Sequence, residues 1–80
     1  MAEQKDYNYT VVFEVASEGG YVVHVPALPG LVTQGETMEE ARAMAKDAIE
    51  GYLSVLKEDG EDIPVESDDT VVAKIRATAP

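Results

Sequence analysis

One amphipathic helix is the feature that most constrains how this chain can fold. Apolar residues recur at three- and four-residue spacing over 38–57, which aligns them along one stripe of a helix. The stripe comprises Ala41, Met44, Ala45, Ala48, Ile49, Tyr52, Leu53 and Leu56. Thr37 and Glu40 have the spacing of a capping box. We expect the Thr37 hydroxyl to accept from the Glu40 amide, and the Glu40 carboxylate to accept from the Thr37 amide.

Gly51 stands inside this helix and costs about 1 kcal/mol relative to alanine there. A close approach of the sheet or of a partner would explain a glycine at this position. A tolerant surface would explain it equally well, and the sequence leaves both explanations open.

The chain is short, and its 80 residues sustain only one small core, of a few strands and one helix. It contains no cysteine, so neither a disulfide nor a thiolate metal site can reinforce the fold. The polar N-terminus and the short apolar runs predict neither a signal peptide nor a membrane span. We therefore expect a single cytoplasmic domain over 1–80, with loose termini at 1–7 and 77–80.

Two alternating segments before the helix predict a β-hairpin. Residues 9–16 and 21–25 alternate with the period of half-buried strands, and Phe13 falls on the face of the first strand that also carries Val11. The intervening Ser-Glu-Gly-Gly at 17–20 supplies glycines for a tight turn.

A corner follows the hairpin. Pro26 has no N–H to donate and so ends the second strand, while Pro29 and Gly30 suit the two central positions of a type II turn. Residues 31–34 are long enough for a short third strand, which we expect Gly35 to end.

The remaining chain predicts an acidic loop and a last strand. Residues 58–69 contain seven acidic residues together with Gly60 and Pro64, which predicts a solvated loop, whereas 70–77 alternate again. A helix between the third and fourth strands lets the fourth lie beside the first, parallel to it. The predicted fold is thus α+β, with order βββαβ and a four-stranded mixed sheet (3-2-1-4) that carries the helix on one face.

The sheet face away from the helix is the predicted partner-binding surface. It is more polar than the helix side but keeps several valines, and an uncovered face with apolar members is where another chain binds. The candidate binding residues are Val12, Glu14, Val22 and His24, and Thr10, Val72, Lys74 and Arg76 are expected on the same face. This face and the open sheet edges also permit a homodimer or a higher homo-oligomer.

The charge balance narrows the kind of partner. Sixteen acidic against six basic residues give a net charge of −10. Such a field repels nucleic acid and anionic membranes, and it steers a basic protein toward the chain. We therefore expect neither direct nucleic-acid binding nor membrane binding.

The residues needed for catalysis are not arranged for it. The chain has one histidine, no cysteine and no glycine-flanked serine elbow. A phosphate at the helix start would face Glu36, Glu39 and Glu40, and Glu14 is predicted on the sheet face that points away from the helix carboxylates. We predict no enzyme, no metal site and no cofactor.

Four segments, in order, resemble the HicB antitoxin family. They are Tyr-Thr-Val-Val-Phe-Glu at 9–14, Gly-Gly-Tyr-Val-Val at 19–23, Val-Pro-Ala-Leu-Pro-Gly at 25–30 and Thr-Gln-Gly-Glu-Thr-Met-Glu-Glu-Ala at 33–41. The resemblance runs from about 7 to 52, over half of the chain. The P-x-L-P-G element followed by T-x-G-x-T-x-x-E-A is its most specific part, and it assigns Pro26, Pro29, Gly30, Gly35, Thr37 and Glu40 to the structural corner and helix cap.

The resemblance implies a prokaryotic antitoxin that blocks HicA, a small basic toxin that resembles a double-stranded-RNA-binding domain and cleaves mRNA with a histidine. It also implies a partial ribonuclease H fold with strand order 3-2-1-4. Typical members carry a C-terminal DNA-binding segment, whereas this chain ends four residues after Arg76, so it resembles the short solitary members. Two alternatives stay open: an orphan self-associating domain of this type, or a divergent ribonuclease H-like, metal-dependent nuclease.

Overall fold

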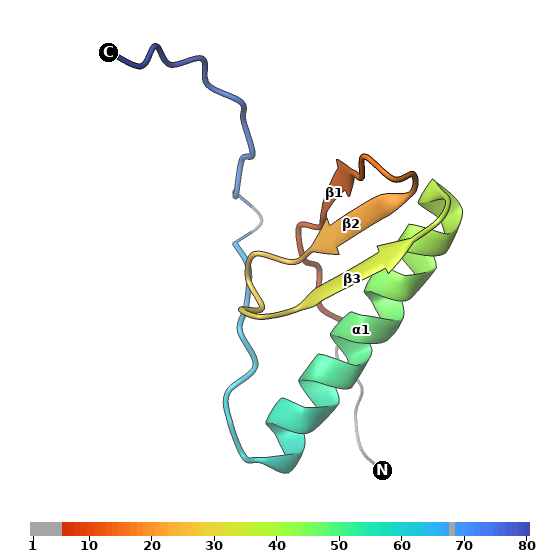
Figure 1. Ribbon diagram of the computed structural model, residues 1–80. Coiled ribbons are helices and arrows are strands. Elements are labelled where there is room, and N and C mark those ends of the chain that lie inside the picture. The colour runs from red at the N-terminus through yellow and green to blue at the C-terminus, as the bar shows by residue number, and fades with distance from the viewer. Residues whose placement is uncertain (1–5, 68) are drawn as a thin grey trace.

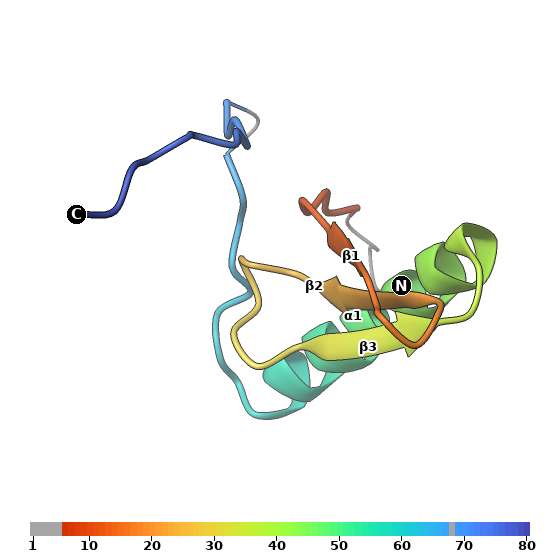
Figure 2. The same ribbon diagram turned by 45° about the horizontal axis from the view of Figure 1, so that its top comes forward.

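The chain folds into one antiparallel sheet with one helix across it (Figure 1). A computed structural model describes residues 6–67 and 69–80. The strands are β1 (Val12–Val15), β2 (Tyr21–His24) and β3 (Val32–Gly35), and the helix α1 spans Met38–Glu58. The strand order is β1-β2-β3, and Figure 2 shows α1 lying along one face of the sheet. The predicted α+β class, with its one helix on one face, is confirmed.

The β1–β2 hairpin forms where the alternation predicted it. Phe13 pairs with Val23 and Val15 with Tyr21, so the two strands are antiparallel and in direct register. In the turn, the Ala16 amide donates to the Gly20 carbonyl at 3.0 Å, and Gly20 has a φ of 77°. This left-handed conformation favours glycine, which explains the glycines of the hairpin.

Two consecutive turns make the predicted corner between β2 and β3. The Leu28 amide donates to the Val25 carbonyl at 2.9 Å across Pro26, and the Leu31 amide donates to the Leu28 carbonyl at 3.1 Å. Gly30 has a φ of 83° in the second turn, as a type II turn requires at that position. These turns fold Leu28 back beneath the sheet, where it is fully buried.

Gly35 belongs to the third strand, whereas the strand was expected to stop at residue 34. It is the last residue of β3, pairs with Tyr21 and is buried. A β-carbon at Gly35 would stand 2.5 Å from the amide nitrogen of Ala41 and 2.6 Å from its α-carbon. Gly35 is therefore needed because the helix backbone approaches β3 too closely for any side chain.

Only one of the two hydrogen bonds of the predicted capping box is formed at the start of α1. The Thr37 hydroxyl accepts from the Glu40 amide at 3.0 Å, as predicted. The Glu40 carboxylate, however, accepts from the Glu36 amide at 3.3 Å rather than from the Thr37 amide. The exposed Glu40 carboxylate thus binds the amide one residue before the predicted one. It still lies at the positive end of the helix dipole.

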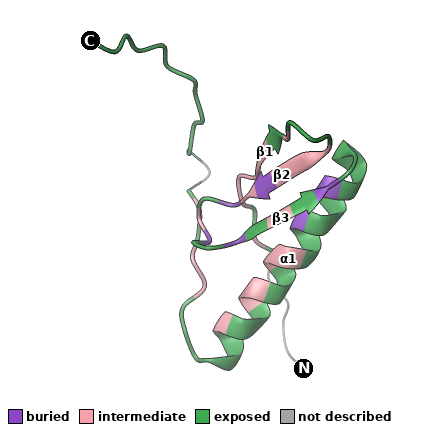
Figure 3. Ribbon diagram, in the orientation of Figure 1, coloured by how far each residue is buried: buried purple, intermediate pink, exposed green. Residues whose placement is uncertain are grey.

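Two small clusters make the core (Figure 3). Ala41 and Ala45, in the first half of α1, pack on Val23, with Phe13 partly buried against them. The second half of α1 covers the corner. Its residues Ala48, Ile49, Tyr52 and Leu53 pack on the cluster of Val25, Leu28 and Leu31. The Tyr52 hydroxyl also donates to the Pro29 carbonyl at 3.0 Å, which ties the helix to the corner.

Gly51 faces open space, because a β-carbon there would meet nothing within 4 Å. A close approach of the sheet is therefore excluded, whereas a close approach of a partner and a tolerant surface both stay open.

The predicted fourth strand is not formed in the structure. In the part of the chain that is described, residues 70–80 belong to no strand and are exposed, and they run away from the sheet (Figure 1). The Thr70 amide donates to the Ser67 carbonyl at 3.1 Å, where this segment begins. The sheet is therefore three-stranded and antiparallel instead of four-stranded and mixed. Alternation predicted a strand, but it does not encode which edge the strand pairs with. Of the predicted loose termini, 77–80 are exposed, and 1–5 lie outside the described residues.

Candidate partner-binding site

The sheet face turned away from α1, which we call the outer face, brings together the four predicted binding residues. Val12 pairs with His24, and Glu14 pairs with Val22. Opposed residues of an antiparallel pair share a face, and Val23, between Val22 and His24, packs on the helix side. The four side chains therefore form one block on the outer face, whose role in binding stays a prediction.

β3 extends this block with two residues that the sequence analysis did not select. Val32 pairs with His24 and Gln34 with Val22, so both share the outer face. Val32 is 59% exposed, whereas the preceding Leu31 is buried in the core. The signal was present in the sequence, since alternation over 31–34 already separated Val32 and Gln34 from Leu31.

One polar contact on the outer face joins β1 to β2. The His24 Nε2 atom lies 3.5 Å from a carboxylate oxygen of Glu14, and the two side chains are 39% and 65% exposed. Such an exposed pair contributes at most about 1 kcal/mol to stability. The Glu14 carboxylate, at 65% exposure, stays accessible to a cation from outside.

The other residues predicted on this face lie elsewhere. Val72, Lys74 and Arg76 are exposed in the segment that pairs with no described strand, so they are not part of the outer face. Thr10 precedes β1 and is engaged by Glu66, from the loop after the helix.

This contact belongs to a group that we call the clasp: Tyr9, Thr10, Pro64 and Glu66. The Thr10 amide donates to both carboxylate oxygens of Glu66, at 2.9 and 3.0 Å, and the Thr10 hydroxyl donates to one of them at 2.5 Å. The Tyr9 hydroxyl donates to the Pro64 carbonyl at 2.5 Å. The acidic loop is thus held beside the start of β1, although its composition had predicted a solvated loop.

The clasp changes the acidity of two of its members. Hydrogen bonds from the Thr10 hydroxyl and then from the Thr10 amide lower the pKa of the Glu66 carboxyl, because they stabilise its charged form. Burial raises the pKa of the Tyr9 hydroxyl, and the nearby Tyr7 and Glu66 raise it further. At neutral pH the clasp therefore joins an ionised carboxylate to protonated donors.

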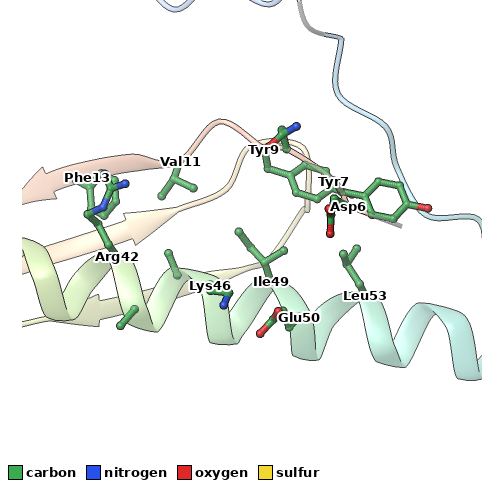
Figure 4. A pocket seen from close by; sticks show the side chains of 13 residues that line it. Asp6, Tyr7, Tyr9, Val11, Phe13, Arg42, Lys46, Ile49, Glu50 and Leu53 are labelled. Atoms are coloured by element: carbon green, nitrogen blue, oxygen red, sulfur yellow. The ribbon is translucent and has the colours of Figure 1, made fainter. Parts of the chain in front are cut away.

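A groove of about 970 Å³ lies between the start of the sheet and α1. Figure 4 shows Tyr7, Tyr9, Val11 and Phe13 on one side of it, with the helix on the other. The helix side is lined by Arg42, Ala43, Ala45, Lys46, Ile49, Glu50 and Leu53. The groove exists because α1 packs chiefly against β3 and β2, which leaves the helix side of β1 poorly covered.

The acidic side chains of the described residues are dispersed rather than clustered. Glu36, Glu39 and Glu40 are all exposed around the start of α1, where a phosphate would have to bind. Among the described residues, no three histidine, aspartate or glutamate side chains lie close enough together to hold a metal ion. The outer face presents the Glu14 carboxylate at the β1 edge beside Val12 and Val22, which suits non-covalent contact with another protein.

Comparison with known proteins identifies the domain. Residues 9–78 match the family model described as the HicB-like antitoxin of bacterial toxin–antitoxin systems. This chain belongs to the HicB-like antitoxin family. The match includes the outer face, the corner, the helix and the C-terminal segment, so all of these are parts of the family's domain.

Individual relatives of this HicB-like chain are of two lengths. A UPF0150 protein from Thermoplasma acidophilum is 50% identical over 56 residues, which cover 70% of this chain and 81% of the relative. Antitoxin HicB 1 from Photorhabdus laumondii is 44% identical over 61 residues, 76% of this chain and 39% of the relative. Antitoxin HicB from Escherichia coli K12 is 44% identical over 59 residues, 74% of this chain and 43% of the relative. The chain thus spans less than half of the two relatives named as antitoxins.

Hydropathy adds one observation on this HicB-like domain. Within residues 6–67 and 69–80, the helix is too polar to cross a lipid bilayer.

Proposed function

We propose that this chain is an antitoxin-type binding domain that masks a small, basic, mRNA-cleaving HicA-like toxin in the cytoplasm of a prokaryote. The observation that carries the proposal is the family match over residues 9–78, which covers nearly the whole chain. A binding role agrees with the outer face, which presents three valines and a carboxylate to another protein.

The proposed mechanism begins with electrostatic capture. The net charge of −10 attracts a basic toxin over roughly a Debye length, about 8 Å at physiological salt, and so raises the rate of encounter. The same charge disfavours direct binding of nucleic acid by this chain. The toxin's own RNA-binding surface, being basic, is the surface that the chain would cover first.

Burial on the outer face would then hold the complex. The valines Val12, Val22 and Val32 provide apolar area, and the exposed Glu14 carboxylate can accept from a lysine or arginine of the toxin. A charged group that becomes buried in an interface with its partner affects dissociation, whereas charges at the rim mainly affect association. A substitution at Glu14 can therefore distinguish electrostatic capture, which affects association, from burial in the interface, which affects dissociation.

Charge reversal at two positions tests this mechanism. Glu14→Lys changes the outer face, and Glu61→Lys makes the same change of net charge in the exposed loop beyond α1. Against a purified HicA-like toxin from the same host, we expect Glu14→Lys to cost on the order of 2–5 kcal/mol of binding free energy through faster dissociation. Glu61→Lys should slow association slightly. Equal effects of both substitutions would show that the outer face does not contact the toxin.

Salt separates the two contributions to inhibition. If the outer face is buried against the toxin, inhibition of RNA cleavage persists in 0.5 M salt, since buried contacts are screened little. Loss of inhibition at modest salt would reduce the mechanism to steering. If no basic toxin binds at any salt concentration, the family membership of this chain indicates its fold but does not identify its partner.

Self-association is a second proposal, and a specific observation favours it. Val15, Val71 and Ile75 are 79%, 85% and 88% exposed, which leaves large apolar side chains in water at the sheet edge and in the C-terminal segment. Monomeric proteins bury or break up such surfaces, so we propose that the chain forms a homo-oligomer, most simply a homodimer.

A further inference from the structure

The C-terminal segment 70–76 has the composition of a strand but is unpaired in the structure. Val71, Val72 and Ile75 are 85%, 66% and 88% exposed, within a run of β-branched and alternating residues. An exposed stretch of this kind readily pairs with any free sheet edge. It also lies within the family match, which extends to residue 78, so the segment is part of the domain.

The sheet has a free edge of matching chemistry. β1 pairs only with β2 among the described strands, so its other side presents unpaired amides and carbonyls. On the helix side of β1, the groove is lined by Val11, Phe13 and Ile49. On the outer face, the same edge presents the Glu14 carboxylate.

The segment matches both sides of this edge. Alternation places Val71, Ala73 and Ile75 on one side of an added strand, where they would enter the apolar groove. The other side then carries Lys74 and Arg76 on the outer face beside Glu14. Lys74 and Arg76 are two of only six basic residues in the chain. Their positive charges would therefore complement the negative charge of Glu14 across the added strand pair.

The segment is directed away from the edge of its own sheet. The clasp holds Glu66 beside Thr10, at the start of β1. The Thr70 amide donates to the Ser67 carbonyl at 3.1 Å, and residues 70–80 lie away from the sheet (Figure 2). In this position the segment is offered to a different molecule rather than to its own β1.

We infer that residues 70–76 of one copy add as a strand to the free edge of β1 in a second copy, and that the second copy reciprocates. This inference rests on the proposed self-association and names the surfaces that produce it. A reciprocal exchange has two-fold symmetry, covers the free β1 edge of both copies, and removes Val71 and Ile75 of both from water.

The first experiment measures mass by sedimentation equilibrium on the full chain, without any toxin. The chain should form a dimer of twice its 8.6 kDa mass. Val71→Asn/Ile75→Asn should raise the dimer dissociation constant on the order of 100-fold or more, since two buried apolar side chains are lost per copy. Val65→Asn is the matched control, because Val65 is 78% exposed and precedes the segment; it should leave the constant unchanged.

The second experiment uses charge exchange between the segment and β1. Lys74→Glu places like charges together at both symmetric contacts and should raise the dissociation constant about 2- to 30-fold. Adding Glu14→Lys to that variant restores opposite charges and should recover most of the loss. A double variant that is no better than the single one would overturn the pairing of these faces.

The outcomes of these experiments distinguish strand exchange from self-association in general and from toxin binding. A monomer at all concentrations refutes self-association, and strand exchange with it. A dimer that the Asn substitutions leave intact supports self-association through another surface and refutes the exchange. A monomer whose amides at 71–76 are protected from hydrogen exchange shows that the segment pairs with its own β1. None of these results bears on toxin binding, because no toxin is present.

Discussion

Replacing Gly35 by alanine is the sharpest test of how the helix is seated on the sheet. The added β-carbon would lie 2.5 Å from the Ala41 nitrogen, 2.6 Å from its α-carbon and 3.0 Å from its β-carbon. The first two of these are helix backbone atoms, so no rotamer change can relieve the overlap. The backbone has to move by about 1 Å to restore ordinary van der Waals contact.

The magnitude follows from two opposing terms. Overpacking of a close contact costs about 1–3 kcal/mol, and the backbone nature of the clash favours the upper end. Reduced freedom of the unfolded chain returns roughly 0.4–1 kcal/mol. Gly35→Ala should therefore lower the free energy of unfolding by about 2 kcal/mol, which for a domain of this size lowers Tm by about 8–16 °C.

Gly51→Ala is the matched control, because it makes the same chemical change with the opposite expected sign. No atom lies within 4 Å of the new methyl group, and the helix gains about 1 kcal/mol from the better propensity of alanine. Urea denaturation followed by circular dichroism, at one fixed chain concentration, measures both variants. If Gly35→Ala is as stable as the original chain, the close approach of α1 to β3 is wrong.

Three further predictions concern the cap, the core and the clasp. Thr37→Ala should lower the unfolding free energy by about 1 kcal/mol in the same assay, since the amide of Glu40 loses its acceptor; unchanged stability would mean that the cap is not formed. Leu28→Ala should cost about 2–5 kcal/mol, because Leu28 is fully buried beneath the corner, and a loss below 1 kcal/mol would place its side chain in solvent. The lowered pKa of Glu66 means that its stabilising contribution is complete above the ordinary value of 4.5 and is lost as pH falls through the lowered one. Denaturation between pH 7 and pH 3 should thus show a stability difference between the original chain and Glu66→Gln that shrinks in acid, whereas a constant difference would exclude the bonds to Thr10.

The elements that could be predicted from the sequence are those whose signals are local. The helix stripe, the Thr37 hydroxyl cap, the hairpin glycines and the Pro29–Gly30 turn all depend on residues within a few positions of one another. The two faces of the hairpin were also predictable, since alternation alone assigns Val12 and Glu14 to one side and Phe13 to the other. The outer face is therefore a property of the sequence pattern.

Other features depend on contacts between distant segments, and local patterns carry no record of them. The clasp joins Thr10 to Glu66 across 56 positions, and nothing in the acidic composition of the loop distinguishes Glu66 from its neighbours. The groove exists only because α1 lies over β3 and β2 rather than over β1.

Gly35 and the C-terminal segment show this division most clearly. The sequence by itself determined that Gly35 lies at the junction of a strand and a helix, but only the tertiary structure showed that it is the contact between them. It likewise determined that residues 70–76 alternate as a strand does, while the tertiary structure shows that they pair with no strand of their own sheet. The physical reason is that alternation specifies which side chains share a face, whereas the choice of edge depends on where the rest of the chain lies in space.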